Sequence, residues 1–395
     1  MTSEMQAAVR GRWAVAAMFL SNGFLFGSWA PQIPLLLPVH QITESTLGLL
    51  ILVLGLGAVA AMSFSGRLIA RYGSRRMVRI FALLSSITLV SVIFAPTVPV
   101  LAVMMAMMGA FLGTMDVSMN ANAVQVERKL NRAIMSSSHG FWSLGGFLGG
   151  GIGGYLISHV GREPHAVGAS IIALLVMLAA MPFLVSDEKA PAVSVPHKNQ
   201  SAGTRDVALY VLGLMALFSM VPEGGVLDWA ALYLTKEHGS SLSTASFAFA
   251  LFAGTMALVR FLGDSVRNRF GAVTTLRISG VVGAIGLMGA SAAPSDLIAI
   301  LCFGIAGLGV ANMVPIVLSA AGNHPGASAG SGIATVSMMG YAGILFAPSA
   351  IGFAAEHIGY RMTYFVLAVL LAIVATLASR VASADRIGAH PHPAE

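Results

Sequence analysis

The chain has 395 residues, of which 56% are hydrophobic and only 10% are charged, and its mean hydropathy is +0.83. Globular domains carry about 25% charged residues, so this composition excludes a water-soluble globular class and indicates a polytopic α-helical membrane protein. The formal net charge of +6 would suit nucleic-acid binding, but the arginines lie between apolar segments, where membrane topology explains them better.

Twelve apolar segments follow one another along the chain, and an even number of spans places both termini on one side of the membrane. Every lysine and arginine except Arg162, Lys236 and Arg361 is counted on that side, Arg260 among them. The positive-inside rule therefore predicts a multi-pass protein of the plasma membrane, the inner membrane of a bacterium, with both termini cytoplasmic. The approximate segments are 12–36, 47–66, 77–95, 99–125, 133–158, 165–186, 207–234, 243–263, 273–293, 296–322, 327–353 and 361–383.

A polar stretch near the middle of the chain separates two sets of six segments. We expect it to form a cytoplasmic linker at 187–206 between an N-terminal half, 1–186, and a C-terminal half, 207–395, which ends in a short cytoplasmic tail. Motifs recur between the halves at an offset of roughly 200 residues: 154–161 with 352–359, 71–73 with 269–271, and 29–30 with 229–230. The sequence thus predicts an all-α membrane protein of twelve transmembrane helices in two pseudo-symmetric six-helix halves.

A basic turn follows the second segment of each half. In the first half it includes Gly66, Arg71, Gly73 and Arg75, and in the second half it includes Asp264 and Arg269. The first turn resembles the Gly-x-x-x-Asp-Arg-x-Gly-Arg-Arg loop of the major facilitator superfamily, although Ala70 stands where the acidic residue is expected. The resemblance covers essentially the whole chain. It implies the major facilitator fold, transport by alternating access, and gating or structural roles for these turn residues.

Two further stretches resemble a narrower group. Residues 222–230 read Pro-Glu-Gly-Gly-Val-Leu-Asp-Trp-Ala, and the fourth segment contains Asp116-x-x-x-Asn120-x-Asn122. Both are similar to bacterial permeases related to fucose permease and to the rhizopine-associated and YbjJ-type membrane proteins. The substrates of that group are sugars or are unassigned, and its sugar members are proton symporters, so the resemblance implies sugar uptake by proton symport as one outcome. Antiporters of the superfamily often carry Gly-Pro-x-x-Gly-Gly in the fifth span. Residues 149–154 match it without the proline, so a proton-driven exporter of amphipathic compounds stays open as an alternative.

Three carboxylates stand inside apolar segments, where a charge is expensive and usually functional. Glu223 lies near the middle of the seventh segment and Asp116 just off the middle of the fourth, and a carboxylic acid in a low-dielectric cavity can bind and release a proton. We expect these two to couple proton movement; for Asp116 the alternative is a structural, hydrogen-bonded acid. Asp228, about 7.5 Å further along the helix than Glu223, is a candidate gate or helix cap.

Amides and rings at similar depth are candidates for substrate contact. Asn120 follows Asp116 by one helical turn, His139 and Trp142 open the fifth segment, and Asn22 and Asn312 lie near the centres of the first and tenth. Such side chains can read sugar hydroxyls, but an amide can equally hydrogen-bond two helices together, and a histidine can terminate a helix. Trp229 is either a stacking surface or, as we favour from its type, an anchor at the membrane interface.

Together these features predict a secondary active transporter that takes up a small polar solute, a sugar or sugar derivative, by proton symport. Its expected partners are that solute, H⁺ and the lipid bilayer, with no nucleic acid, and the expected state is a monomer. Sodium coupling stays open, because carboxylates and amides also suit a cation site. The sequence has no phosphate-binding Gly-rich loop ending in Gly-Lys-Ser/Thr and no zinc-type His and Cys spacing, so we expect no cofactor, no metal and no enzyme. A non-transporting receptor or scaffold ranks below both transporter hypotheses.

Overall fold

The computed structural model describes residues 3–130, 134–186, 206–324 and 329–386, and these ranges contain helices and turns but no strand. The first part of the chain forms these elements: α1 (Ser3–Trp29), η1 (Ala30–Gln32), α2 (Ile33–His40), α3 (Glu44–Tyr72), α4 (Ser74–Ser86), α5 (Thr88–Ile93), α6 (Val98–Leu130), α7 (Met135–Val160), α8 (Arg162–Ala180) and η2 (Met181–Phe183). The second part forms α9 (Val207–His238), α10 (Leu242–Phe270), α11 (Ala272–Ala292), α12 (Asp296–Val310), α13 (Met313–Gly322), α14 (Ala329–Thr376) and η3 (Ala378–Arg386).

The predicted class, an all-α polytopic membrane protein, is confirmed. Among the described residues, 10 stretches are long and apolar enough to cross a membrane. Two features account for the difference from twelve predicted segments. The 48 residues of α14 contain a non-helical residue, Gly359, so this element is two helices joined by a sharp turn. The 26-residue α7, which is rich in glycine, is not among those stretches, although it is a full-length helix.

Glycines with a left-handed backbone mark equivalent turns in the two parts of the chain. Gly73 and Gly271 follow α3 and α10 with φ of 81° and 78°, and Gly161 and Gly359 have φ of 92° and 82°. A side chain at such φ values is sterically unfavourable, so glycine permits an abrupt change of direction between consecutive helices. The matching geometry at matching positions agrees with the internal repeat read from the sequence.

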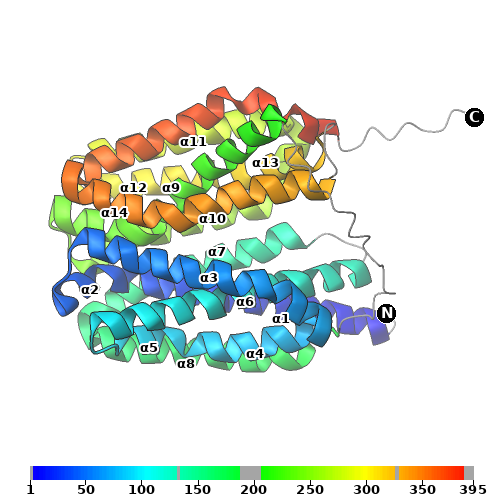
Figure 1. Cartoon of the computed structure of the whole chain (residues 1–395), viewed down its shortest axis with the longest axis horizontal. Helices are drawn as coiled ribbons and strands as arrows, with labels where there is room; N and C mark the ends of the chain where they lie inside the picture. The colour runs from blue at the N-terminus through cyan, green and yellow to red at the C-terminus, as the bar shows by residue number, and fades with distance from the viewer. Residues whose placement is uncertain (1–2, 131–133, 187–205, 325–328, 387–395) are drawn as a thin grey trace, which may run out of the picture.

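The helices are arranged in two layers, with α1 to α8 in one and α9 to α14 in the other, as Figure 1 shows. The layers meet where α7 packs along α10 and α3 along α14. Small residues allow this close packing: a Cβ on Gly48 would lie 2.9 Å from the Pro348 carbonyl oxygen, and one on Gly154 would overlap Ser246. The linker predicted at 187–206 lies outside the described residues except for Asp206, so the boundary between the halves stays a prediction.

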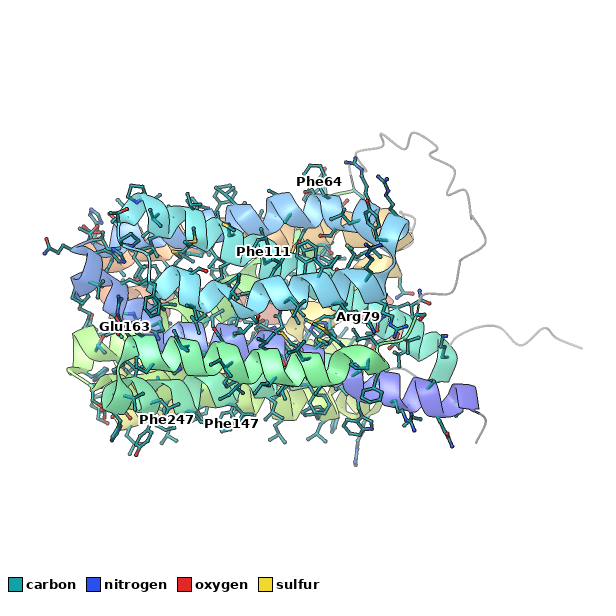
Figure 2. The ribbon with its side chains drawn as sticks, turned by 90° about the horizontal axis from the view of Figure 1, so that it is seen from below. Phe64, Arg79, Phe111, Phe147, Glu163 and Phe247 are labelled. Carbon is teal, nitrogen blue, oxygen red and sulfur yellow. The ribbon has the colours of Figure 1, made fainter. Side chains whose placement is uncertain are left out.

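Large apolar side chains cover the outside of the bundle. Phe64, Phe147 and Phe247 are 58%, 37% and 45% exposed, and in Figure 2 they lie along the rim of the bundle. Arg79 and Glu163 lie toward opposite ends in the same view. An apolar girdle with charges toward the ends is the pattern of a protein that has lipid as its lateral solvent.

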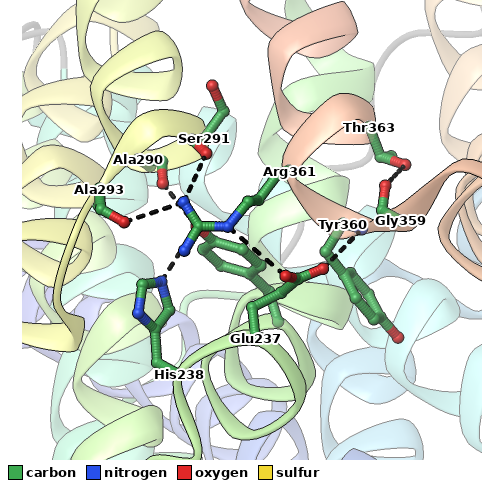
Figure 3. A network of polar contacts seen from close by, with 10 residues as sticks. Glu237, His238, Ala290, Ser291, Ala293, Gly359, Tyr360, Arg361 and Thr363 are labelled. Carbon is green, nitrogen blue, oxygen red and sulfur yellow. Dashed lines mark hydrogen bonds and ion pairs between the residues drawn. The ribbon is translucent and has the colours of Figure 1, made fainter.

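The start of α1 and the 3₁₀ segment η3, the first and last described elements, lie at one end of the bundle (Figure 1), and we call the other end the distal end. There the layers are joined by polar contacts: Lys236 Nζ lies 3.0 Å from Glu44 Oε1, and the Ser45 backbone N–H donates to Glu356 Oε2 at 3.0 Å. The arginines of the distal end bind backbone carbonyls. Figure 3 shows Arg361, which donates to the carbonyl oxygens of Ser291 and Ala293 at 3.3 and 3.0 Å.

Arg361 also forms an ion pair with Glu237, at 3.5 Å. The same arrangement recurs in the first layer, where Arg162 donates to the Ile93 carbonyl at 3.1 Å and pairs with Glu163 at 2.6 Å. Each arginine thus satisfies carbonyls that the end of a neighbouring helix leaves without intrahelical partners. These contacts give Arg162 and Arg361 a structural role at the distal end.

Candidate transport site

A polar cluster inside the first layer is centred on Asn22 of α1, which is fully buried. Its amide nitrogen donates to the Leu112 carbonyl of α6 at 3.3 Å, and its amide oxygen accepts from the Trp142 indole N–H of α7 at 2.9 Å. The ring of Phe26 lies 5.9 Å from that of Trp142. Asn22 therefore links three helices and fixes the orientation of the Trp142 ring. Of the two roles that the sequence allowed for Asn22, this contact is the interhelical hydrogen bond.

A second polar cluster joins α6 to α7. The Asn120 amide nitrogen donates to the Asp116 backbone carbonyl at 2.9 Å, and its oxygen lies 3.2 Å from Nε2 of His139. The His139 ring is held edge-to-face against Phe19 of α1, with centroids 5.1 Å apart. The sequence placed Asp116 and His139 at a similar depth; the structure brings Asn120 between them as the bridging group. Asn120, Asp116 and His139 are all partly buried.

Arg260 of α10 connects the two layers. One guanidinium nitrogen lies 3.2 Å from Glu223 Oε1 on α9, and another donates to the Ser143 hydroxyl on α7 at 2.7 Å. The side chains of Arg260 and Glu223 are only 16% and 27% exposed, so the pair is largely removed from bulk solvent. Arg260 also lies close enough to His139 for the two to interact electrostatically.

Arg260 is the main functional candidate that sequence reasoning missed. Counting basic residues by side of the membrane assigned it to a loop, whereas α10 continues to Phe270 and Arg260 is inside the helix. A signal was available: Arg260 falls within the apolar segment 243–263, and the intramembrane Glu223 required a compensating charge.

Asn312 does not join the clusters of α1, α6 and α7. It stands at the break between α12 and α13, and its amide is packed against Gly263 of α10, where a Cβ would lie 2.5 Å from Asn312 Oδ1. The structure thus places this predicted substrate contact between α10 and the broken tenth span. The interrupted helix is a feature that transporters use near their binding sites.

Asp228 and Trp229 are both buried, at 9% and 0% exposure. The favoured assignment of Trp229 as an interfacial anchor is therefore wrong. Its ring is packed against Gly352 of α14, where a Cβ would come within 2.7 Å of the indole, and it lies 6.4 Å from the ring of Tyr360. Hydropathy gives the depth of a residue but not the side of the helix on which it lies, and Trp229 faces the protein.

The basic turn after α3 is held by contacts to a neighbouring helix end rather than by an acid at position 70. Arg75 donates to the Ser186 hydroxyl and the Pro182 carbonyl at 2.7 and 3.2 Å. Gly73 supplies the left-handed turn, whereas a Cβ on Gly66 would meet open space. The predicted gating residues Arg71 and Arg269 are exposed and lie beside the rings of Tyr72 and Phe270; the side chain of Asp264 lies outside the described ones.

Two apolar grooves lie away from these polar residues. One, of about 310 Å³, is lined by α1, α7 and α8, and the other, of about 440 Å³, by α9 and α14. Ser21, Ser28 and His165 line the first groove, and neither groove is lined by Asn22, Asp116, Glu223 or Arg260. Among the described residues no group of three or more His, Cys, Asp or Glu side chains could hold a metal ion.

Comparison with known proteins gives the family. The family model described as Major Facilitator Superfamily matches residues 15–325 and 212–394. The uncharacterized transporter y4wD of Sinorhizobium fredii is 33% identical over 366 residues, which cover 92% of this chain and 96% of the relative. Membrane protein MosC of Rhizobium meliloti is 31% identical over 357 residues, 90% of this chain and 86% of MosC.

Solved transporters share the fold. A D-xylose-proton symporter matches with a TM-score of 0.73 and 15% identity, covering 94% of this chain and 97% of that one. The nucleoside transporter NupG, solved as a mutant, matches with a TM-score of 0.72 and 14% identity, covering 94% and 99%. At these identities the likeness shows the fold alone.

The helical fold and the relatives together define a membrane transport protein, not an enzyme. The chain belongs to the major facilitator superfamily. The resemblance predicted from the basic turns is thereby confirmed, while the narrower permease group stays a prediction.

Proposed function

We propose that the protein takes up a small polar solute, a sugar or sugar derivative, together with a proton, by alternating access of its two halves. The observation that carries the proposal is the position of Arg260, which binds Glu223 on its own side and Ser143 on the opposite side of the interface between the layers. A substrate that binds between the layers would contact groups from both of them.

The lining of the proposed site is suited to hydroxyl groups. Asn22, Asn120, His139 and Trp142 supply neutral donors and acceptors from the first half, and Asn312 is the proposed counterpart in the second. Amide and imidazole groups read hydroxyls through directional hydrogen bonds, and an indole ring can cover the apolar face of a sugar. A site lined by apolar side chains alone would instead suit amphipathic compounds.

Proton coupling is proposed to involve Glu223 and Asp116. A proton that adds to a Glu223 carboxylate oxygen removes the negative charge that Arg260 pairs with, so Arg260 becomes available to the substrate or to Ser143 alone. Release of the proton restores the ion pair. A conformation in which the Glu223–Arg260 pair is formed and one in which the pair is open would therefore bind the proton with different affinities. Coupled transport requires such a difference. Asp116, beside the bridging Asn120, is the proposed proton site of the first half.

The orientation and assembly belong to the same proposal. We infer that the end with the start of α1 and η3 is cytoplasmic, from the distribution of lysine and arginine, and that the distal end faces outward in a bacterial inner membrane. In this orientation the Lys236–Glu44 pair lies on the outer side. A monomer is sufficient for the mechanism, since the proposed site is formed between the halves of one chain.

The test is the pH outside lightly buffered, de-energised cells when candidate sugars are added. Wild-type protein should cause external alkalinisation with at least one sugar, and Glu223→Gln and Asp116→Asn should abolish it at equal expression. Silence across the sugar panel, combined with proton movement driven by lipophilic cations, would overturn the uptake proposal in favour of export.

A further inference from the structure

A buried carboxylate outside the Glu223–Arg260 pair has no assigned role. Asp228 lies on α9, three residues beyond Gly225, and is 9% exposed. The face beside it is packed against α14: a Cβ on Gly225 would come within 2.9 Å of Leu367 and 3.1 Å of Ile351, and the Tyr364 hydroxyl donates to the Gly225 carbonyl at 2.9 Å. Asp228 is therefore a buried residue of α9 close to the contact between α9 and α14.

Asp228 makes no hydrogen bond and no ion pair with any residue of the described ranges. The titratable group that faces it from α14 is the Tyr364 phenol, whose proton is already donated to Gly225. Three cations on neighbouring segments are paired with other carboxylates: Lys236 with Glu44, Arg260 with Glu223, and Arg361 with Glu237. None of the ion pairs among the described residues includes Asp228.

The contrast with Glu223 is informative, because the two carboxylates are on the same helix. Glu223 is partly exposed and has a guanidinium partner, so its charge is compensated. An ionised carboxylate that is buried without a partner is unfavourable, and such a group neutralises by taking up a proton. Burial of Asp228 without a recorded partner, while α9 is packed on α14, therefore favours the neutral form of its carboxyl group over the charged form.

In the internal repeat, only the second half of the chain has an acidic residue at the position of Asp228. The Trp-Ala pair at 229–230 corresponds to the pair at 29–30, so the position equivalent to Asp228 is Ser28. Ser28 is fully buried, and its hydroxyl has no hydrogen-bond partner in the described structure. A small neutral group therefore occupies the equivalent site in the first half, whereas the second half carries a group that can be charged.

We propose that Asp228 is a proton-binding site separate from the Glu223–Arg260 pair, protonated while α9 is packed on α14 and ionised when that packing opens to water. The step is a simple proton transfer: a proton from water adds to one Asp228 carboxylate oxygen, no bond between heavier atoms breaks, and the reverse step returns it to water. The role as a carrier of the transported proton rests on the proposed function, while the protonation itself does not.

The experiment measures protonation without a substrate. Infrared spectra of the purified protein in lipid nanodiscs, recorded near neutral pH, report the carbonyl stretch of protonated carboxylic acids. We expect wild type to show such a band, Asp228→Asn to lose a component of it, and the matched control Glu223→Gln to keep that component. A spectrum of Asp228→Asn identical to wild type, or loss of the component in Glu223→Gln instead, would overturn the proposal.

Isotope labelling keeps the test valid if Asp228→Asn folds poorly. Wild-type protein with isotope-labelled aspartate carboxyl groups should show the band shifted, and glutamate-labelled protein should not. Asp228→Ser, which copies the residue of the first half, is the second variant, and Asp116→Asn separates the contribution of Asp116. A band that follows glutamate, or that disappears entirely in Asp116→Asn, would refute the assignment. Failure here leaves the sugar-driven alkalinisation test untouched, so the two proposals can fail separately.

Discussion

Removing the positive charge of Arg260 is the most informative perturbation of the site. Arg260→Gln deletes the contact to Glu223 at 3.2 Å and weakens the one to Ser143 at 2.7 Å. Breaking a fully buried ion pair by removing one partner costs about 3–5 kcal/mol, and an exposed pair is worth about 0–1 kcal/mol. Because the two side chains are 16% and 27% exposed, we expect an intermediate loss of about 2 kcal/mol.

A double-mutant cycle separates the pair from the surrounding packing. Thermal denaturation in detergent or nanodiscs would be followed for wild type, Arg260→Gln, Glu223→Gln and the double variant. We expect the double variant to be at least as stable as the less stable single variant. Each single variant leaves one buried charge without its partner, whereas the double variant has lost both charges. Strictly additive losses would show that Arg260 and Glu223 do not interact, and would refute the bridging role of Arg260.

Three further predictions concern the fold, each measured by the same thermal denaturation assay. Gly73→Ala should lower stability by about 1–2 kcal/mol because of the left-handed backbone, whereas Gly66→Ala, in the same basic turn but facing open space, should be neutral or slightly stabilising; equal effects would contradict this. Trp229→Ala should cost about 3–5 kcal/mol as a buried large-to-small change. Trp229→Phe should cost much less, since the indole N–H has no partner among the described residues, and equal losses for the two would contradict the burial argument. Lys236→Gln should cost less than about 1 kcal/mol, because Lys236 is 53% exposed in its pair with Glu44; a larger loss would show that this pair stabilises the distal end more than an exposed ion pair does.

The sequence predicted the elements that depend on local chemistry. Apolar length located the helices, and the basic motif after the second segment of each half located two turns, where Gly73 and Gly271 have nearly the same backbone geometry. Depth along the helices was sufficient to place His139 beside the turn of α6 that carries Asp116, where its ring contacts Asn120; a direct role for Asp116 and His139 as a pair stays a prediction.

The sequence could not predict which way a side chain faces. Trp229 was assigned to the membrane interface by its residue type, but burial against Gly352 depends on how α9 is rotated relative to α14. Arg260 was assigned to a loop because counting charges treats every arginine as a topology signal. Its pairing with Glu223 is a contact between helices α9 and α10, and only the packed structure reveals it.

Proton coupling through Glu223 is tested most directly by accumulation in proteoliposomes of the purified protein with an imposed inward proton gradient, using the sugar that causes alkalinisation in cells. We expect wild type to accumulate the sugar above its external concentration, while Glu223→Gln only equilibrates it and still exchanges labelled for unlabelled sugar. Full accumulation by Glu223→Gln would refute proton coupling through Glu223, because the pair that Glu223 forms with Arg260 would then have no part in it.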